Sequence, residues 1–393
     1  MTIRPLAILV ATATMAGPVV AAPPLEAYGN LPAVETIELS PSGMRFATIA
    51  TIGEQRRLIV GTPEGEVLRV AAIGDRKVSG FKWVGDNHVL VRTHNTFKAP
   101  FLLAARQVEL WGVSNLTVAT GKVASVFDKL RCSGNTVFGE FGSATFDKHT
   151  YGYFSAVRFI ETRTRDCMVD TSQGVLMSDL YKVDLDSGKV RRIARGSQRH
   201  RSWVVGSDGS IVAHDEFMRE DGVWRLYAGK DHDKLLMEID APVVTPDLTG
   251  PGRTSGTVLV FDPTSDRDSV IEVNVGSGAT EELAHDENTG TPLRDRDSDL
   301  LLGFDTDNPD YPEVFNQALR SRLIGTHKAF PGYQVRVLSF SQNFDRLIVF
   351  TDGNNDSGTY WLVNIPKGKA DPIGYAYPKV STKDVGLTRM FSY

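Results

Sequence analysis

The stretch DLYKVDLDSGKVRRI, from Asp179 to Ile193, decides the fold because it joins two strand patterns through a polar turn. The same order of strand, turn and strand occurs seven times, centred on Leu58, Trp111, Tyr181, Tyr227, Glu272, Phe315 and Trp361. From Tyr181 onward the centres lie 46, 45, 43 and 46 residues apart. A nearly constant period of this size, with four strands in each unit, indicates a β-propeller. The sequence therefore predicts an all-β protein, a seven-bladed β-propeller of four-stranded antiparallel blades.

A further strand pattern precedes the central one in most repeats, as in SPSGMRFATI at 40–49 and GSDGSIVAHD at 206–215. Short runs of apolar residues bounded by Ser-Gly or Asp-Gly are typical of hairpins. Helical periodicity is almost absent. Only the residues at 312–323 are ambiguous, and their fit to the period favours a strand. The innermost strand of each blade is predicted to be mainly apolar.

The N-terminal residues 1–22 have the features of a secretory signal peptide: a basic Arg4, an apolar stretch, and small residues at Ala21 and Ala22. We therefore expect an exported protein, periplasmic or secreted. The rest of the chain has no hydrophobic run near the ~20 residues that a membrane-spanning helix needs. No membrane association is expected after signal cleavage.

Three further segments follow the signal. Residues 23–38 are rich in proline and are predicted to form an N-terminal arm, and residues 39–380 form the propeller. The gap of 70 residues between Trp111 and Tyr181 predicts an insertion around 128–178. Residues 381–393 end in the beginning of a strand pattern. They are interpreted as a connector to a C-terminal hydrolase domain that is missing from this chain.

Composition excludes one class of partner. Hydrophobic residues make up 41% of the chain and charged residues 23%, which is typical of a globular protein. The net charge is −5 and the isoelectric point is near 5.9. A protein that binds nucleic acid through its phosphates carries the opposite balance. We expect no nucleic-acid partner.

Cys132 and Cys167 are the only cysteines. In an exported protein, two cysteines favour a disulfide over a metal site or a nucleophile, and two buried free thiols are the alternative. The bond would close a loop of about 35 residues.

No complete catalytic motif occurs. A G-x-S-x-G elbow, an H-E-x-x-H pair, a C-x-x-C pair and the nucleotide-binding fingerprints are all absent. The sequence therefore assigns no catalytic residue, no cofactor and no metal ligand.

Three charged groups are candidate sites. The aspartates between 295 and 310 suggest calcium ligands, but turn capping is favoured. The basic run from Lys189 to Arg201 suggests a carboxylate site, but a solvated blade edge is favoured. The string His214-Asp215-Glu216 lacks a serine or metal partner and is not assigned a role. The members of the first two groups are Asp295, Asp297, Asp299, Asp305, Asp307 and Asp310, and Lys189, Arg191, Arg192, Arg195, Arg199 and Arg201, with His200 beside them.

Three stretches resemble the N-terminal part of exported S9-family serine peptidases, which include prolyl oligopeptidases, dipeptidyl peptidases and acylaminoacyl peptidases. They are PPLEAYGNLPAVETIELSPSGMRFA at 23–47, KAFPGYQVRVLSFSQNFDRLIVFTDG at 328–353 and GTYWLVNIPKGKADPIGYAYPKV at 358–380. Tyr393 matches the tyrosine of a strand that opens the hydrolase domain in that family. The family's catalytic Ser, Asp and His lie in that domain, so the resemblance assigns none of them to a residue here.

The resemblance implies a non-catalytic propeller that caps a peptidase active site and admits peptide substrates while excluding folded proteins. On this interpretation the chain is inactive alone, and its partner is the α/β-hydrolase domain. The alternative is a stand-alone periplasmic propeller, similar to the TolB type, that binds protein partners. A propeller enzyme with a ligand in its central channel is a third possibility, and it would need polar residues converging on the innermost strands.

Overall fold

The computed structural model describes residues 23, 25–74, 76–98, 107–133, 135–170, 172, 176–264, 266–306 and 308–387. The predicted signal peptide at 1–22 and the end of the predicted connector, 388–393, lie outside these residues. The described chain is predominantly β-strand, as the sequence predicts. None of its helices is both long and apolar enough to span a membrane.

The described strands form six four-stranded antiparallel sheets. The first contains β1 (Val34–Leu39), β2 (Phe46–Ile52), β3 (Gln55–Gly61) and β4 (Val67–Ala72). The second contains β5 (Lys77–Val84), β6 (His88–Lys98), β7 (Gln107–Thr117) and β8 (Lys122–Ser125). The third contains β9 (Gly139–Phe146), β10 (His149–Val157), β13 (Ser178–Asp184) and β14 (Val190–Ala194).

The other three complete sheets follow in chain order. One contains β15 (His200–Val205), β16 (Ile211–Met218), β17 (Val223–Ala228) and β18 (Leu235–Asp240). The next contains β19 (Asp247–Pro251), β20 (Thr257–Asp262), β21 (Ser269–Asn274) and β22 (Thr280–His285). The last contains β25 (Gln334–Phe340), β26 (Arg346–Gly353), β27 (Asp356–Asn364) and β28 (Lys369–Tyr375).

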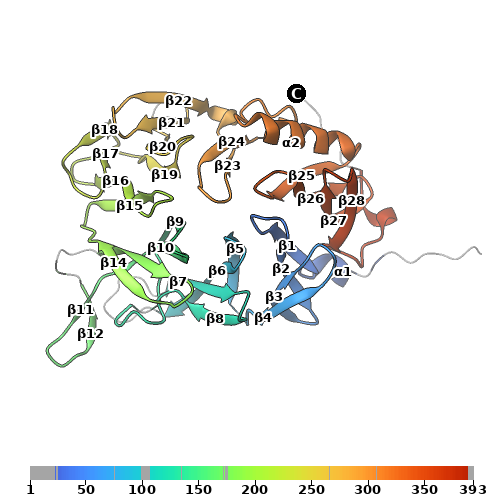
Figure 1. Ribbon diagram of the computed structural model, residues 1–393, viewed down its shortest axis with the longest axis horizontal. Helices are drawn as coiled ribbons and strands as arrows, with labels where there is room; N and C mark the ends of the chain where they lie inside the picture. The colour runs from blue at the N-terminus through green and yellow to red at the C-terminus, as the bar shows by residue number, and fades with distance from the viewer. Residues whose placement is uncertain are drawn as a thin grey trace, which may run out of the picture.

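Figure 1 shows these sheets arranged radially around a central axis, with the first strand of each sheet innermost. Two-stranded β23 (Thr291–Arg294) and β24 (Leu301–Asp305) stand between the fifth four-stranded sheet and the last. Six of the seven repeat centres lie on the third strand of a four-stranded sheet. Their residues are Leu58, Trp111, Tyr181, Tyr227, Glu272 and Trp361.

Apolar packing between neighbouring sheets forms the core. The described residues contain seven hydrophobic clusters, and each lies between one sheet and the next around the ring. The middle strands are therefore covered on both faces, as in β20, where five of six residues are buried. The outermost strands are more exposed, as in β4, where three of six residues are exposed and none is buried. This pattern follows from sheets that stack face to face.

The strand prediction at 312–323 is wrong, because this segment forms helix α2 (Gln317–Ala329). The side chain of Asn316 caps the helix by accepting a hydrogen bond from the amide of Leu319 at 3.0 Å. Leu319 and Leu323, four residues apart, lie on one face and are buried against Tyr311. The repeat period is kept here, but α2 stands where two outer strands were expected.

The inserted residues also occupy a narrower range than the predicted 128–178. β9 and β10 are regular strands of the third sheet. The extra residues form a separate hairpin between β10 and β13, made of β11 (Phe159–Glu161) and β12 (Cys167–Val169). Figure 1 shows this hairpin projecting from the edge of the ring. A disulfide joins Cys167 on the second strand of the hairpin to Cys132 in the loop between β8 and β9, and the Cα atoms of the two residues are 5.2 Å apart.

The first and last sheets meet and close the ring. The predicted arm at 23–38 is only partly separate, because β1 begins at Val34 and belongs to the first sheet, while α1 (Glu26–Gly29) precedes it. The amide of Leu39 donates to Ser339 Oγ at 3.0 Å, and the hydroxyl of Tyr360 donates to the carbonyl of Glu35 at 2.8 Å. Leu39 and Phe350 share a buried cluster across this junction.

Truncating the closing contact should destabilise the whole ring. Leu39 is fully buried, so Leu39→Ala removes apolar contacts and leaves a cavity, with an expected loss of about 2–5 kcal/mol in the free energy of unfolding. Urea denaturation measures this loss. The matched control is Leu235→Ala on the outer strand β18, where the side chain is 48% exposed and a change below about 1 kcal/mol is expected. Equal losses in the two variants would contradict closure at Leu39.

Removing the disulfide should also lower stability. The double variant Cys132→Ser/Cys167→Ser opens a loop whose ends are 35 residues apart, and the chain-entropy model gives a loss of about 3–4 kcal/mol. Thermal and urea unfolding measure it. Reduction of the unmodified protein should produce the same decrease, and reduction of the double variant should produce none.

Candidate functional site

Three histidines and a glutamate come together within one sheet. His200 begins β15, His214 and Glu216 lie on β16, and His232 is in the turn between β17 and β18. Glu216 is two residues after His214, so both side chains lie on the same face of the strand. The strand register places Glu216 directly opposite His200. One potential ligand atom from each of the four side chains lies within 4.8 Å of those of the other three.

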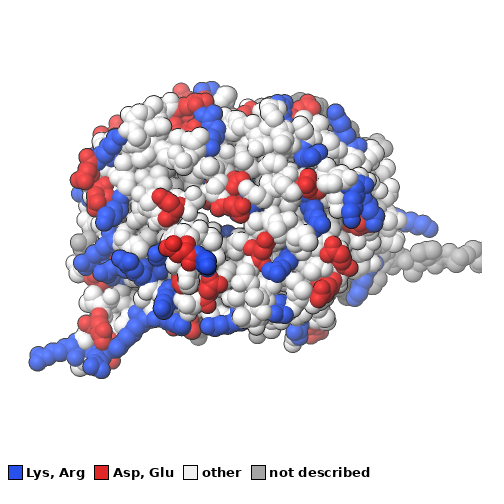
Figure 2. All heavy atoms as spheres, in the orientation of Figure 1, with Lys and Arg blue, Asp and Glu red and all other residues white. Residues whose placement is uncertain are grey.

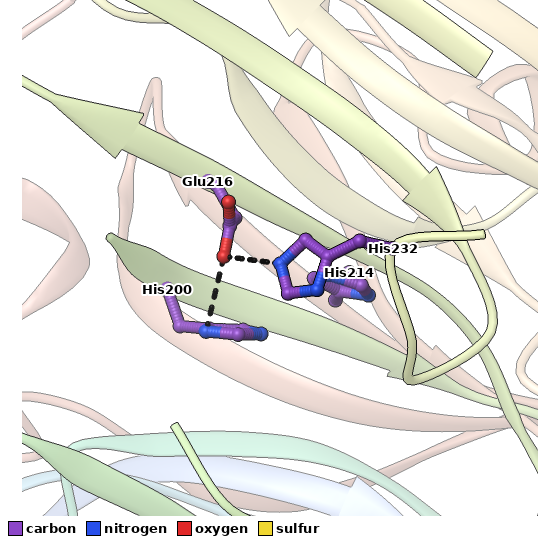
Figure 3. Close-up of side chains that lie close together, drawn as sticks. All are labelled: His200, His214, Glu216 and His232. Atoms are coloured by element: carbon purple, nitrogen blue, oxygen red, sulfur yellow. Dashed lines mark hydrogen bonds and ion pairs between the residues drawn. The ribbon is translucent and has the colours of Figure 1, made fainter. Parts of the chain in front are cut away.

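The carboxylate of Glu216 is the centre of this group, which we call the histidine cluster. Its Oε1 is 2.8 Å from Nε2 of His232 and 3.3 Å from Nδ1 of His200. Figure 3 shows the carboxylate between these two imidazoles, with His214 beside His232. Glu216 and His200 are almost completely buried, whereas the side chain of His232 is 55% exposed. The cluster therefore has one side open to solvent.

His214 is held in a defined tautomer. Its Nδ1 donates a hydrogen bond to the carbonyl of Gly229 at 2.8 Å, so Nε2 carries the free lone pair. His214 is 0% exposed, and this Nε2 has no hydrogen-bond partner among the described residues. The ring is stacked between His200 and Tyr227, at centroid distances of 4.7 and 5.4 Å.

His200 contacts both Ser197 and Glu216. The backbone amide of Ser197, which can only donate, lies 3.1 Å from Nδ1 of His200, so this nitrogen accepts a hydrogen bond. The carboxylate of Glu216 lies 3.3 Å from the same nitrogen, over the face of the ring. Burial, followed by the nearby His214, lowers the pKa of His200 to about 4, and burial lowers the pKa of His214 as well. Both rings are neutral at neutral pH.

A buried ion pair positions His200. Asp179, which is 0% exposed, accepts a hydrogen bond from Nε of Arg158 at 2.9 Å and another from the amide of Gly196 at 3.1 Å. Arg158 also donates to the carbonyl of Gly196. Gly196 and Ser197 precede His200, so this pair fixes the backbone that carries it. Asp215, between His214 and Glu216, accepts from Trp224 Nε1 at 2.8 Å and secures β16 to β17.

A second group of potential ligands consists of His149, Asp184 and Asp186. Here the carboxylates already have partners. Asp184 caps the turn after β13 by accepting hydrogen bonds from the amides of Asp186 and Ser187. Oδ1 of Asp186 lies 3.1 Å from Nε2 of His88. Such hydrogen bonds are common in turns, and they explain why these three side chains lie close together without a bound metal ion.

Several members of the charged groups named from the sequence have structural partners. Asp295 accepts from the amides of Asp297 and Ser298 and so caps the turn between β23 and β24; Asp307 lies outside the described residues. In the basic run, Arg192 pairs with Asp179 at 3.2 Å and Arg199 pairs with Asp221 at 3.6 Å. Figure 2 shows Lys and Arg gathered over β14 and on the hairpin of β11 and β12.

Charged side chains also line the inner strands, which the sequence predicts to be mainly apolar. Arg296, in the turn between β23 and β24, forms an ion pair with Glu38 on β1 and donates to the carbonyl of Leu39 at 3.0 Å. On the next inner strands, Lys82 lies 3.5 Å from Glu140. Figure 2 shows acidic and basic atoms around the hollow at the centre of the ring. The prediction failed because alternate residues of an inner strand face this axis rather than a neighbouring sheet.

Two serines of the described ranges form hydrogen bonds with histidines, but neither pair has the geometry of a catalytic triad. Ser197 Oγ and Glu216 both contact Nδ1 of His200, whereas a triad needs serine and acid on opposite ring nitrogens. Ser79 lies 2.9 Å from Nδ1 of His94, but it belongs to the regular strand β5 rather than to a strained elbow. Glu109 is the acidic residue near His94. Its carboxylate lies 3.6 Å from Nε2 of His94 and accepts a hydrogen bond from Lys77 rather than from this histidine.

His214 and Glu216 stand out in the sequence, but the cluster does not, and the sequence assigns no metal ligand. The H-x-E spacing on a strand was an available signal, because it places two ligating side chains on one face. His200 and His232 join through strand register and a hairpin turn, which the sequence alone does not align. Three of the eight histidines lie in this one sheet.

No protein-family model and no curated protein matches this chain. Among solved structures, it is similar to a prolyl endopeptidase at 11% identity and a TM-score of 0.46, covering 88% of this chain and 50% of that one. A puromycin-hydrolyzing peptidase of Mycobacterium tuberculosis is similar at 10% identity and a TM-score of 0.43, covering 89% and 54%. TolB from Acinetobacter baumannii is similar at 10% identity and a TM-score of 0.33, covering 63% and 53%. The chain thus spans about half the length of each.

Breaking the buried pair behind the cluster should be costly. Asp179→Ala leaves Arg158 uncompensated and the Gly196 amide without its acceptor, so we expect a loss of about 3–5 kcal/mol in the free energy of unfolding. Urea denaturation measures it. The control is Asp371→Ala, which removes an exposed partner of Lys369 and should cost less than about 1 kcal/mol. A loss below about 1 kcal/mol for Asp179→Ala would show that the pair does not hold this region.

Proposed function

We propose that this chain is the non-catalytic, substrate-gating propeller part of an exported S9-like serine peptidase that acts on peptides. In this proposal the α/β-hydrolase domain lies outside the chain and supplies the catalytic Ser, Asp and His. The ring comprises seven blades, with β23, β24 and α2 as the sixth. Seven core clusters, one between each pair of neighbouring modules, support this count.

The observation that carries the proposal is the ion-paired axis of the ring. Arg296 and Glu38 come from modules that are not neighbours, because the sheet of β25 to β28 stands between them around the ring. Gln342 of that intervening sheet accepts from the amide of Arg296 at 3.1 Å and donates to Asp295 at 2.7 Å. Three modules are thereby tied together at the axis.

Polar contacts between modules at the axis are consistent with an opening that selects peptides by size. Burial raises the pKa of Glu38, while Arg296 and Lys82 act in the opposite direction, so the carboxylate depends on its cationic neighbours. An opening bounded by ion pairs admits a thin, flexible chain more easily than a folded domain. The three stretches of sequence that resemble S9 peptidases lie in the first and last sheets and in the segment before β25. They therefore flank the ion pair between Arg296 and Glu38.

The test expresses the reading frame that contains this chain to its natural stop codon, beside the chain alone. We expect the long product to cleave short peptide nitroanilides and the chain alone to have no activity above the blank. In the long product, Arg296→Ala should raise the rate on unfolded casein relative to the short peptide by several-fold. The matched control is Arg225→Ala, which breaks a pair with Glu238 on outer strands and should leave that ratio unchanged.

Three outcomes would contradict the proposal. Hydrolysis by the chain alone that is lost in Ser79→Ala or Ser197→Ala would place an active site within it. An unchanged ratio in Arg296→Ala would remove the gate. A stop codon directly after Tyr393, with specific capture of another exported protein by the chain, would favour the TolB-like alternative, a stand-alone propeller that binds protein partners.

A further inference from the structure

We propose that His200, His214, Glu216 and His232 form a Zn²⁺ site with four protein ligands. The inference is independent of the proposed function, since it concerns one blade and neither its gate nor a hydrolase domain. Three imidazoles and one carboxylate are a donor set that zinc accepts in proteins, and a site with four protein ligands is structural rather than catalytic.

The distances in the histidine cluster suit this ion. Donor atoms on a tetrahedral zinc with bonds of about 2.0–2.1 Å lie about 3.3 Å apart. Oε1 of Glu216 is already 2.8 Å from Nε2 of His232 and 3.3 Å from Nδ1 of His200. All four donor atoms lie within 4.8 Å of one another, so small side-chain rotations bring the fourth into range.

The strongest observation is the buried Nε2 of His214, which has no hydrogen-bond partner in the part of the chain that the structure describes. A side chain that is 0% exposed rarely leaves a polar atom without a partner. The opposite nitrogen, Nδ1, donates to the carbonyl of Gly229, and this is the second contact that zinc-binding histidines commonly make. The hydrogen bond therefore orients the ring and leaves its lone pair free for a cation.

The contact between His200 and Glu216 brings a carboxylate next to this imidazole. Oε1 of Glu216 lies 3.3 Å from Nδ1 of His200 in a buried place, and this nitrogen accepts a hydrogen bond from the amide of Ser197. Figure 3 shows the carboxylate over the face of the imidazole. Coordination through Nδ1 therefore requires the His200 ring to turn about its side-chain bonds, and the zinc bond replaces the hydrogen bond from Ser197.

The site has an entry path and a structural role. His232 is 55% exposed and lies in the turn between β17 and β18, so an ion can arrive from solvent and be closed in by this turn. The bound ion would join the inner strand β15 to the outer hairpin of the same sheet. A ligand that binds only the folded state stabilises that state in proportion to the logarithm of its concentration.

The test uses tag-free protein, since a histidine tag would bind the same metals. Elemental analysis after dialysis against Zn²⁺ should give one zinc per chain, and the melting temperature should rise with ZnCl₂ but not with MgCl₂. In His232→Ala the zinc affinity should fall at least ten- to a hundredfold, because a ligand is lost from an exposed position where the fold tolerates change. Co²⁺ should give the visible d–d bands of a tetrahedral site, and these bands should disappear in the same variant.

Two matched controls separate this site from others. His285→Ala removes a histidine of similar exposure from β22 and should keep the zinc and the shift in melting temperature. His149→Ala removes the only histidine of the group it forms with Asp184 and Asp186 and should also keep them. Zinc content well below one per chain, an unchanged affinity in His232→Ala, loss of zinc in His149→Ala instead, or octahedral Co²⁺ bands would each overturn the proposal.

Discussion

Apolar packing between each sheet and the next is the interaction on which the rest of the structure depends. A four-stranded sheet has two apolar faces, and a radial stack buries both of them only if the last sheet also covers the first. The contact of Leu39 with the last sheet meets this condition, and the described strands of the first and last sheets are each consecutive in the chain. Every inner strand is then held at a fixed distance from the axis, and the polar groups on it acquire fixed partners.

The two polar features of the molecule follow from this geometry in different ways. The ion pair between Arg296 and Glu38 joins modules that are remote in the sequence, so it exists only because the ring closes. The histidine cluster lies within a single sheet and depends on the register of β15, β16 and β17. The buried pair of Asp179 and Arg158 connects the third sheet to the segment before His200. Closure, register and this pair together place the charged groups.

Helix α2 shows how much variation the ring tolerates. The module containing β23 and β24 has two strands where its neighbours have four, yet its apolar contacts on both sides remain. The buried residues of α2, Leu319 and Leu323, supply the surface that outer strands supply elsewhere. The outer half of a module can therefore change its secondary structure, provided that an apolar face is still offered to the next sheet.

The sequence by itself determined the all-β class, the period, six of the seven strand centres and the pairing partners available to the two cysteines. These are local properties, because alternation of apolar residues and turn chemistry act over a few positions. It failed at 312–323, where the period favoured a strand and the cap at Asn316 with good helix formers favoured α2. Only the tertiary structure decided which side chains meet. His200 and His232 join His214 and Glu216 through strand register and a hairpin, and Arg296 reaches Glu38 through ring closure, because contacts between distant residues depend on how whole sheets are placed.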